Sequence, residues 1–305
     1  MTKKIIVLAV GILLFNFCFS QENDTVKYKR LVKFPVLTID NYNNPSSDFT
    51  ANKKNASIGT NEFITQLSFA IPVKKQKTYL FNSFKYTNST YQSSINGSES
   101  LSTNVYTFRY IFGLIQALPE RWRLTIDIVP NICADFKEPI GNEDFIFYGA
   151  VLAMKRVGPN REYGFGLAYA SYVSLFEGPF IIPIYTLIKK KGKLTTRMIL
   201  PTYFQQLYEL NKNTQVGYRI DIDGNFHNVL YNKELAEFDL NAISNIKLTA
   251  GPYIQRKLFG DLYLNGKIDI IPVNYFSVLD DKRDKELSFF TGSNIYAKFG
   301  LSLLK

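Results

Sequence analysis

Apolar and polar residues alternate along most of this chain with a period of two. The stretch RWRLTIDIVPN (121–131) is apolar at every second position, and QVGYRIDID (215–223) repeats the pattern. This period places one set of side chains on each face of a β-strand. The alternation predicts twelve strands, near 61–71, 77–91, 102–114, 121–135, 143–156, 161–175, 180–189, 193–209, 213–226, 238–256, 260–276 and 287–304.

Two further interpretations raise the strand count from twelve to fourteen. Residues 30–39 (RLVKFPVLTI) have the pattern of a first strand. The stretch 193–209 becomes two strands if Pro201 marks a turn, because proline inside a sheet is confined to edges and bulges. With a first strand at 30–39, the segment 40–60, which is rich in Asn and Ser, is expected to form an outer loop. Both counts stay open at this point.

The strand lengths favour a membrane β-barrel over a soluble sandwich. Several predicted strands, such as 121–135 and 238–256, are far longer than the about five or six residues of an average globular strand. Aromatic residues make up 15% of the chain, which suits a barrel with one face in lipid and one in water. After the first 20 residues, no apolar run approaches the ~20 residues that a transmembrane helix needs.

The last predicted strand, 287–304, alternates almost to the end of the chain. An exposed edge of this kind favours aggregation, so we expect it to pair with the first strand and close a cylinder. Lys298, Gly300, Leu301 and Leu303 resemble the C-terminal signal that barrel-assembly machinery reads, although Lys305 stands where that signal has an aromatic residue. The predicted fold is therefore all-β, an antiparallel transmembrane β-barrel of 12–14 strands after a signal peptide.

The first twenty residues have the features of a secretory signal peptide. Lys3 and Lys4 precede the apolar run 5–15, and the sequence CFS ends at Ser20, which places the expected cleavage before Gln21. The expected organisation is a signal peptide at 1–20, an N-terminal segment at 21–60 that includes the possible strand at 30–39, and a barrel at 61–305. The expected location is the outer membrane of a Gram-negative cell.

Charge and cysteine content narrow the partners. Cleavage would remove two lysines and no acidic residue, so the net charge falls from +10 to +8. For an exported protein, this charge favours contact with outer-membrane lipid and lipopolysaccharide phosphates, and the sequence has no nucleic-acid-binding module. Only Cys133 would remain, which excludes an intrachain disulfide. One His and one Cys do not make a transition-metal site, and no cofactor is expected.

A set of charged residues falls on the polar faces of the predicted strands and is expected to face the lumen. Buried charges are costly unless they are paired or wet. They either pair across a plugged interior or line a water-filled pore, in which case the cationic excess favours anions. The candidate lumen-facing residues are Arg109, Arg121, Arg123, Asp127, Arg219, Asp221, Asp223, Lys247, Lys267, Asp269 and Lys298.

Few residues point to catalysis or metal binding. His227 is the single histidine and ends a predicted strand, where a lipid hydrolase would need a general base beside a serine. No serine lies at strand spacing within its own strand, so a solvated loop histidine is the simpler interpretation. Asp221, Asp223 and Gly224 resemble part of a calcium loop, but Leu230 occupies the position of the closing glutamate. A lumenal charge ladder explains these aspartates better.

Two further patterns describe the walls. Small residues share one face of the strand 161–175, where they leave room either for a bulky neighbouring side chain or for a solute; they are Gly164, Gly166, Ala168 and Ala170. Aromatic residues near predicted strand ends suit the interfacial girdles of a membrane barrel; they are Tyr79, Tyr106, Trp122, Tyr148, Tyr163, Tyr185 and Tyr253.

Three stretches resemble an uncharacterised outer-membrane β-barrel family of the Bacteroidota. They are RWRLTIDIVP, LTTRMILPTYFQQLYELNKNTQVGYRI and YIQRKLFGDLYLNGKI. The resemblance implies an outer-membrane barrel and supplies no activity or functional residue. The leading hypothesis is a small channel or transport-related barrel for polar solutes, with a charged lumen. The alternatives are an outer-membrane lipid-acting enzyme that uses His227, and a closed structural or adhesive barrel.

Overall fold

The computed structural model describes residues 35–51, 54–74, 77–95, 98–173, 178–229, 242–279, 285–291 and 294–304. The expected signal peptide and residues 21–34 of the N-terminal segment lie outside these ranges. Within them, the two helical turns, η1 (Pro119–Arg121) and η2 (Asn142–Asp144), lack the length and apolar character to cross a membrane.

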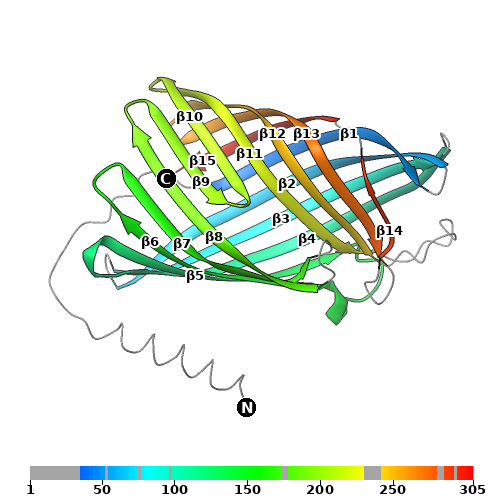
Figure 1. Ribbon diagram of the computed structural model, residues 1–305, viewed down its shortest axis with the longest axis horizontal. Helices are drawn as coiled ribbons and strands as arrows, with labels where there is room; N and C mark the ends of the chain where they lie inside the picture. The colour runs from blue at the N-terminus through cyan, green and yellow to red at the C-terminus, as the bar shows by residue number, and fades with distance from the viewer. Residues whose placement is uncertain are drawn as a thin grey trace, which may run out of the picture.

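Strands dominate the described residues and form one sheet that closes on itself (Figure 1). The strands are β1 (Pro35–Ala51), β2 (Lys54–Lys74), β3 (Thr78–Ile95), β4 (Ser98–Ala117), β5 (Trp122–Ala134), β6 (Phe145–Arg156), β7 (Arg161–Val173), β8 (Gly178–Lys191), β9 (Leu194–Leu200), β10 (Tyr203–Asn211), β11 (Thr214–Asn228), β12 (Ala242–Phe259), β13 (Leu262–Leu279), β14 (Lys285–Phe290) and β15 (Asn294–Leu304).

The barrel has fourteen strands, because β14 and β15 are two parts of one interrupted strand. β14 pairs with one end of β13, at Tyr275–Leu279, and β15 pairs with the other end, at Leu262–Ile271. β15 also pairs with β1, with Leu304 opposite Pro35 and Ala297 opposite Asn43. The predicted pairing of the last strand with the first is thus confirmed, and the fourteen-strand interpretation with a turn at Pro201 is correct.

The structure differs from the expected outer loop at 40–60. β1 continues to Ala51 and β2 begins at Lys54, so this segment is mostly paired strand. β3 and β4 likewise pair through much of 92–101, another stretch expected to be a loop. Asn and Ser residues suggest turns in a sequence, but a β-ribbon that rises above the bilayer has water on both faces. Its polar side chains therefore do not oppose strand pairing.

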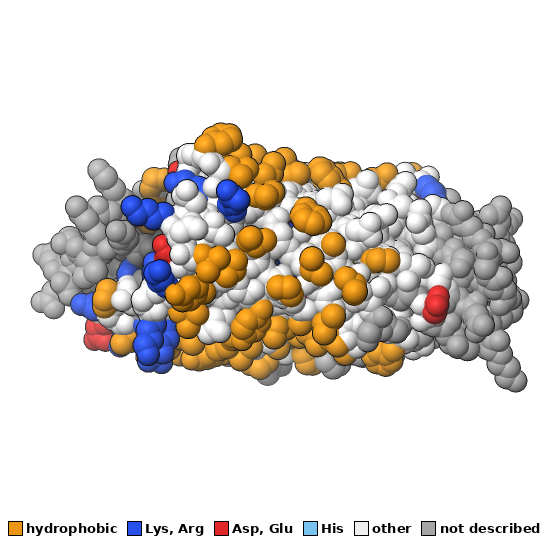
Figure 2. Space-filling view, turned by 90° about the horizontal axis from the view of Figure 1, so that it is seen from above, with side chains coloured by type: hydrophobic (Ala, Val, Ile, Leu, Met, Phe, Trp, Pro, Cys, Tyr) orange, Lys and Arg blue, Asp and Glu red, His pale blue; other side chains and the backbone are white. Residues whose placement is uncertain are grey.

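An apolar band encircles the outside of the barrel. On β15 the outward residues Ile295 and Phe299 are 63% and 62% exposed, and on β7 Phe165 is 58% exposed. Figure 2 shows apolar side chains over the middle of one face of the barrel, with Lys and Arg gathered toward one end. A closed barrel with an apolar outer band and an inner face of polar residues is a transmembrane β-barrel.

The two ends of the barrel differ in their turns. At one end the connections are short, for example 192–193, 212–213 and 260–261. Toward the other end, the connections vary in length, from the two residues 201–202 to the ten residues 135–144. We call these the short-turn end and the long-turn end. Bacterial barrels place short turns in the periplasm and long loops outside the cell.

This difference predicts the orientation of the barrel in cells. Asn213→Cys lies in a short turn and Glu138→Cys in a long one, and both positions are exposed. A membrane-impermeant maleimide should label Glu138→Cys in intact cells, and Asn213→Cys only after the outer membrane is permeabilised. The unmodified chain is the control, since its Cys133 is buried and should stay unlabelled. Labelling of Asn213→Cys in intact cells would contradict this orientation.

Candidate functional site: a polar chamber below an inward-folded flap

A polar cavity of about 560 Å³ occupies the short-turn half of the barrel. It extends from rim residues such as Pro35 and Leu304 to Tyr42 and Asp223, about half-way up the wall. Its wall comes from β1–β3, β8–β13 and β15, and we call it the chamber. The charged residues that line it are Asp40, Lys85, Lys190, Arg197, Glu209, Arg219, Asp221, Asp223, Lys267 and Lys298.

Most of the deeper charges in the chamber wall are paired. Lys267 Nζ lies 2.6 Å from a carboxylate oxygen of Asp221 and 2.6 Å from one of Asp269. Arg219 also contacts Asp221, at 2.6 Å, and Lys298 Nζ lies 2.8 Å from Asp40. Pairing offsets the cost of holding these charges away from bulk water. The wall is therefore largely a neutralised network, with a smaller set of free charges.

One ion pair crosses the lumen above the chamber. Lys247 Nζ on β12 lies 3.0 Å from Glu62 Oε1 on β2, and the two side chains are only 4% and 7% exposed. Between β12 and β2 the wall contains β13, the β14–β15 strand and β1, so the pair spans a chord of the barrel. Tyr42 and Tyr296 lie beside it, with ring centroids 5.4 Å apart. These four residues narrow the lumen at the top of the chamber.

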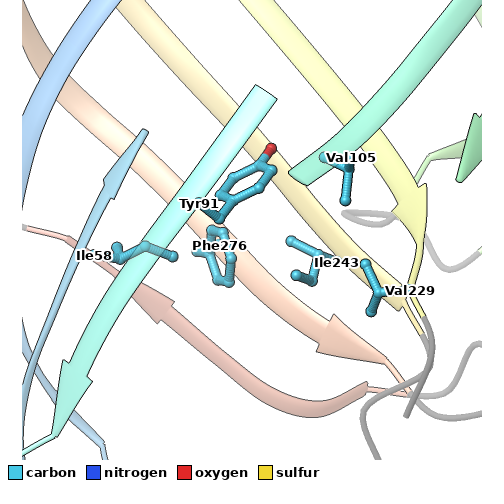
Figure 3. Close-up of a cluster of buried hydrophobic side chains, with 6 residues drawn as sticks. All are labelled: Ile58, Tyr91, Val105, Val229, Ile243 and Phe276. Carbon is cyan, nitrogen blue, oxygen red and sulfur yellow. The ribbon is translucent and has the colours of Figure 1, made fainter. Parts of the chain in front are cut away.

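Above this constriction, the ends of β11–β13 bend into the barrel. We call residues 226–229, 242–244 and 276–279 the flap. On its inner side, Val229, Ile243 and Phe276 pack against side chains that point inward from the opposite wall (Figure 3). Those partners are Ile58 on β2, Tyr91 on β3 and Val105 on β4, the last two at most 1% exposed.

The outer side of the flap packs against the barrel wall from within. Phe226, Ala242 and Leu279 lie on the face that would meet lipid if these strands stayed in the wall. Instead they contact inward-facing residues of β5–β7, namely Cys133, Ile146 and Tyr172.

Two polar contacts fix the tip of the flap. Asn228 forms a bridge with Ala134 at the end of β5, and its side chain donates to Asp144 Oδ1 at 3.1 Å. The flap thus lies between two walls and fills the long-turn end of the lumen with apolar side chains.

His227 lies in this flap, buried against the opposite wall. It is 1% exposed, its Nδ1 is 3.5 Å from Thr107 Oγ1, and its ring meets Tyr91 edge-on at 6.1 Å between centroids. Its Nε2 has no hydrogen-bond partner within the described part of the chain. A general base needs a nucleophile within hydrogen-bond reach. The packing around His227 instead resembles that of a core residue, and the solvated loop position expected from the sequence is wrong.

The structure places the eleven candidate charges as follows. Arg219, Asp221, Asp223, Lys267 and Lys298 line the chamber, and Lys247 and Asp269 are buried beside it. Arg109, Arg123 and Asp127 point inward from β4 and β5. The exception is Arg121, which is exposed in the turn η1 with φ of 64°. Its strand begins one residue later, because η1 reverses the chain after Pro119.

The three inward residues of β4 and β5 have local partners. Arg123 pairs with Glu162 across β6, and Arg109 Nε donates to Asn131 Oδ1 at 2.5 Å. A Cβ on Gly113 would lie 2.5 Å from Asp127 Oδ1, so this carboxylate rests over the glycine.

Sequence reasoning missed several charges of the site. Glu62 shares a face with Ile64 and Gln66, so the alternation signal was present but not used. Asp40 falls one residue beyond the predicted first strand. Lys85 lies in a stretch whose two faces both look apolar. No sequence signal links Glu62 to Lys247, because strands at opposite ends of the chain meet only when the barrel closes.

The structure also settles two patterns of the wall. A Cβ on Gly164 would lie 2.5 Å from the carbonyl oxygen of Ala153 and 2.7 Å from Met154 Cγ, so this glycine allows the backbone and a side chain of β6 to approach closely. Tyr148 lies under Arg109 inside the barrel, and Tyr253 donates to Asn265 in the chamber wall. These two tyrosines do not belong to an interfacial girdle.

The described residues contain no group of three or more His, Cys, Asp or Glu side chains arranged to hold a metal ion. Asp221 is one of the two aspartates that resemble a calcium loop. Its carboxylate forms ion pairs with Arg219 and Lys267.

The fold and its lumen define a transmembrane β-barrel of the outer-membrane type. The chain belongs to the family described as Domain of unknown function (DUF6268), whose model matches residues 21–250. No curated protein sequence matches this chain.

Among solved structures, the chain is similar to the COG4313 outer membrane channel from Pseudomonas putida F1, with 9% identity, a TM-score of 0.47 and coverage of 93% of this chain and 100% of that one. It is also similar to the outer membrane phospholipase A from Escherichia coli, with 10% identity, a TM-score of 0.35 and 95% of each chain covered. Likenesses this weak carry no information about function.

The crossing ion pair gives a test of the constriction. Lys247→Met removes the ammonium group that pairs with the buried Glu62 and should lower the free energy of unfolding by about 3 kcal/mol. The double variant Glu62→Leu/Lys247→Met removes both charges and should recover most of that loss. Urea unfolding in lipid vesicles measures both. If the single and double variants were equally unstable, the loss of stability in Lys247→Met would not come from an uncompensated Glu62 charge.

Proposed function

We propose that this protein is a channel for small polar solutes in the outer membrane, closed at its long-turn end by the flap. The observation that carries the proposal is the chamber, whose 560 Å³ are lined mainly by polar and charged side chains. A barrel that served only as a structural element would gain more from an apolar or fully packed interior. Polar groups around a cavity instead provide hydrogen bonds to water and solute.

The charges of the chamber wall support a modest preference for anions. Six of the lining residues are basic and four are acidic. Lys85 and Arg197 have no carboxylate partner in the described structure, and Asp223 is the acidic residue most exposed to the chamber. Unpaired charges act on a passing ion more strongly than paired ones. Small organic or inorganic anions are therefore the solute class that fits this wall best.

The location of the channel and its partners in the membrane are part of the same proposal. Export by a cleaved signal peptide, insertion by barrel-assembly machinery and contact with lipopolysaccharide at the long-turn end are what we expect of an outer-membrane barrel. The exposed residues Lys191, Lys193, Lys212 and Arg256 lie at the short-turn end, where they can reach lipid headgroups. An origin in the Bacteroidota rests on the sequence resemblance alone.

The flap supplies the closed state of the channel. Its two apolar faces are buried, one against β2–β4 and the other against β5–β7. Moving it out of the lumen breaks the packing of both clusters and exposes the inner face and its partners on β2–β4 to water, which costs free energy in proportion to the apolar area uncovered. The channel is thus expected to open rarely, and weakening either cluster should raise the open fraction.

Planar-bilayer conductance tests this proposal. The refolded protein should show infrequent single-channel steps with a small anion preference. Phe276→Ala removes a large side chain from the inner cluster of the flap and should raise the open probability about tenfold or more, since such truncations cost about 3 kcal/mol of packing.

Phe84→Ala is the matched control, because Phe84 is 51% exposed on the outer face of β3 and should leave conductance unchanged. Absence of steps from both the unmodified chain and Phe276→Ala would reject the channel and favour a closed structural or adhesive barrel.

A further inference from the structure

The barrel wall is incomplete beside the β9–β10 hairpin. β8 pairs with β9 only from Tyr185 to Lys191, and β10 pairs with β11 only as far as Asp221. The backbone N–H of Ile222 still donates to the carbonyl oxygen of Thr202 in the hairpin turn. Residues 178–184 of β8 and 223–228 of β11 therefore have no strand between them among the described residues. Figure 1 shows the short hairpin ending part-way along the barrel, between the longer β8 and β11. We call this break in strand pairing the wall gap.

The position of the flap accounts for the wall gap. Phe226 of β11 packs on Cys133 and Ile146, which point inward from β5 and β6. A strand held inside the lumen is not available to pair with β8. The sequence of β8 fits an unpaired edge, because Pro179 and Pro183 lie in its upper half and proline lacks the N–H that a central strand must donate.

The outer border of the wall gap is lipid-facing. Ile181 on β8 is 60% exposed and Ile222 on β11 is 40% exposed, and both belong to the apolar outer band. On β7, the neighbours of this part of β8 are the exposed Leu167 and Tyr169. The break in strand pairing therefore lies at the level of membrane hydrocarbon, where molecules dissolved in the lipid are its nearest neighbours.

The inner border is apolar as well, unlike the chamber. Leu152, Ala168, Ile182 and Ile184 point inward from β6–β8 and are half-buried rather than covered by other side chains. A wall that met only water would gain nothing from such residues. Directly below, Arg197 on β9 points into the chamber and has an aromatic contact, 6.0 Å to the ring of Tyr203, but no carboxylate partner in the described structure.

We propose that the wall gap is a lateral passage for anionic amphiphiles with a single acyl chain, in addition to the polar route proposed above. The acyl chain lies along Ile182 and Ile184, and the carboxylate is held by Arg197 at the top of the chamber. A charge-assisted hydrogen bond from a guanidinium suits a carboxylate, and the apolar wall suits the chain. This passage does not require the flap to open, so it can be tested independently of the polar channel.

Uptake of radiolabelled dodecanoate tests the passage in intact cells. The full chain is expressed in a bacterial host that has no outer-membrane fatty-acid channel of its own. It should raise dodecanoate uptake above the empty vector and leave uptake of butyrate, which lacks a long chain, unchanged. Ile182→Asn should lower dodecanoate uptake at least about fivefold by making the inner wall polar. Arg197→Gln should lower it about tenfold by removing the charged contact with the carboxylate.

The control variant is Ile111→Asn, the same change at an inward, half-buried position on β4, away from the wall gap. It should retain dodecanoate uptake within about twofold. Heat-modifiable gel mobility reports folding of each variant, and Ile184→Thr replaces Ile182→Asn if the latter fails to fold. Equal uptake with and without the folded chain, or an equal loss in Ile111→Asn and Ile182→Asn, would overturn the passage.

Discussion

Lipid hydrocarbon offers no partner for a backbone N–H or C=O group, and the rest of this structure depends on that constraint. A sheet that spans the membrane meets this constraint by closing on itself, so that its strands pair on both edges along most of their length. The pairing of β15 with β1 meets this demand and brings residues near the two ends of the described chain into register. The wall gap beside the β9–β10 hairpin interrupts strand pairing. Closure also creates an interior. Part of it remains open as the chamber, part is narrowed by the constriction, and part is filled by the flap.

The interior shows how polar and apolar packing divide the lumen. In the short-turn half, acidic and basic side chains pair along the wall, as Lys267 does with Asp221 and Asp269. In the long-turn half, the flap fills the space with apolar side chains from both of its faces. Glu62 and Lys247 mark the boundary, where a buried ion pair is followed by Tyr91 and Phe276. Solutes in the chamber thus meet a charged barrier first and an apolar one behind it.

Much of the barrel could be predicted from the sequence, because alternation and turn residues are local properties. Pro201 identified the turn between β9 and β10, and the charged faces of β11–β13 were assigned to the lumen from their spacing alone. The flap could not be predicted, since Phe226 has the spacing of a lipid-facing residue and becomes buried only because its strand bends inward. The wall gap depends on that bend, so it could not be predicted from the sequence either. Pairing across the barrel, as between Glu62 and Lys247, depends on closure and leaves no local trace.

The location of β11 has a mechanical consequence. The end of this strand occupies one place at a time, either inside the lumen on Cys133 and Ile146 or within the wall toward β8. In the first arrangement, which the structure shows, the flap fills the long-turn end of the lumen and β11 does not pair with a strand at the wall gap. In the second, the long-turn end is cleared while the returning strand narrows the wall gap. If both proposed routes exist, movement of this one strand would clear one exit and narrow the other at the same time.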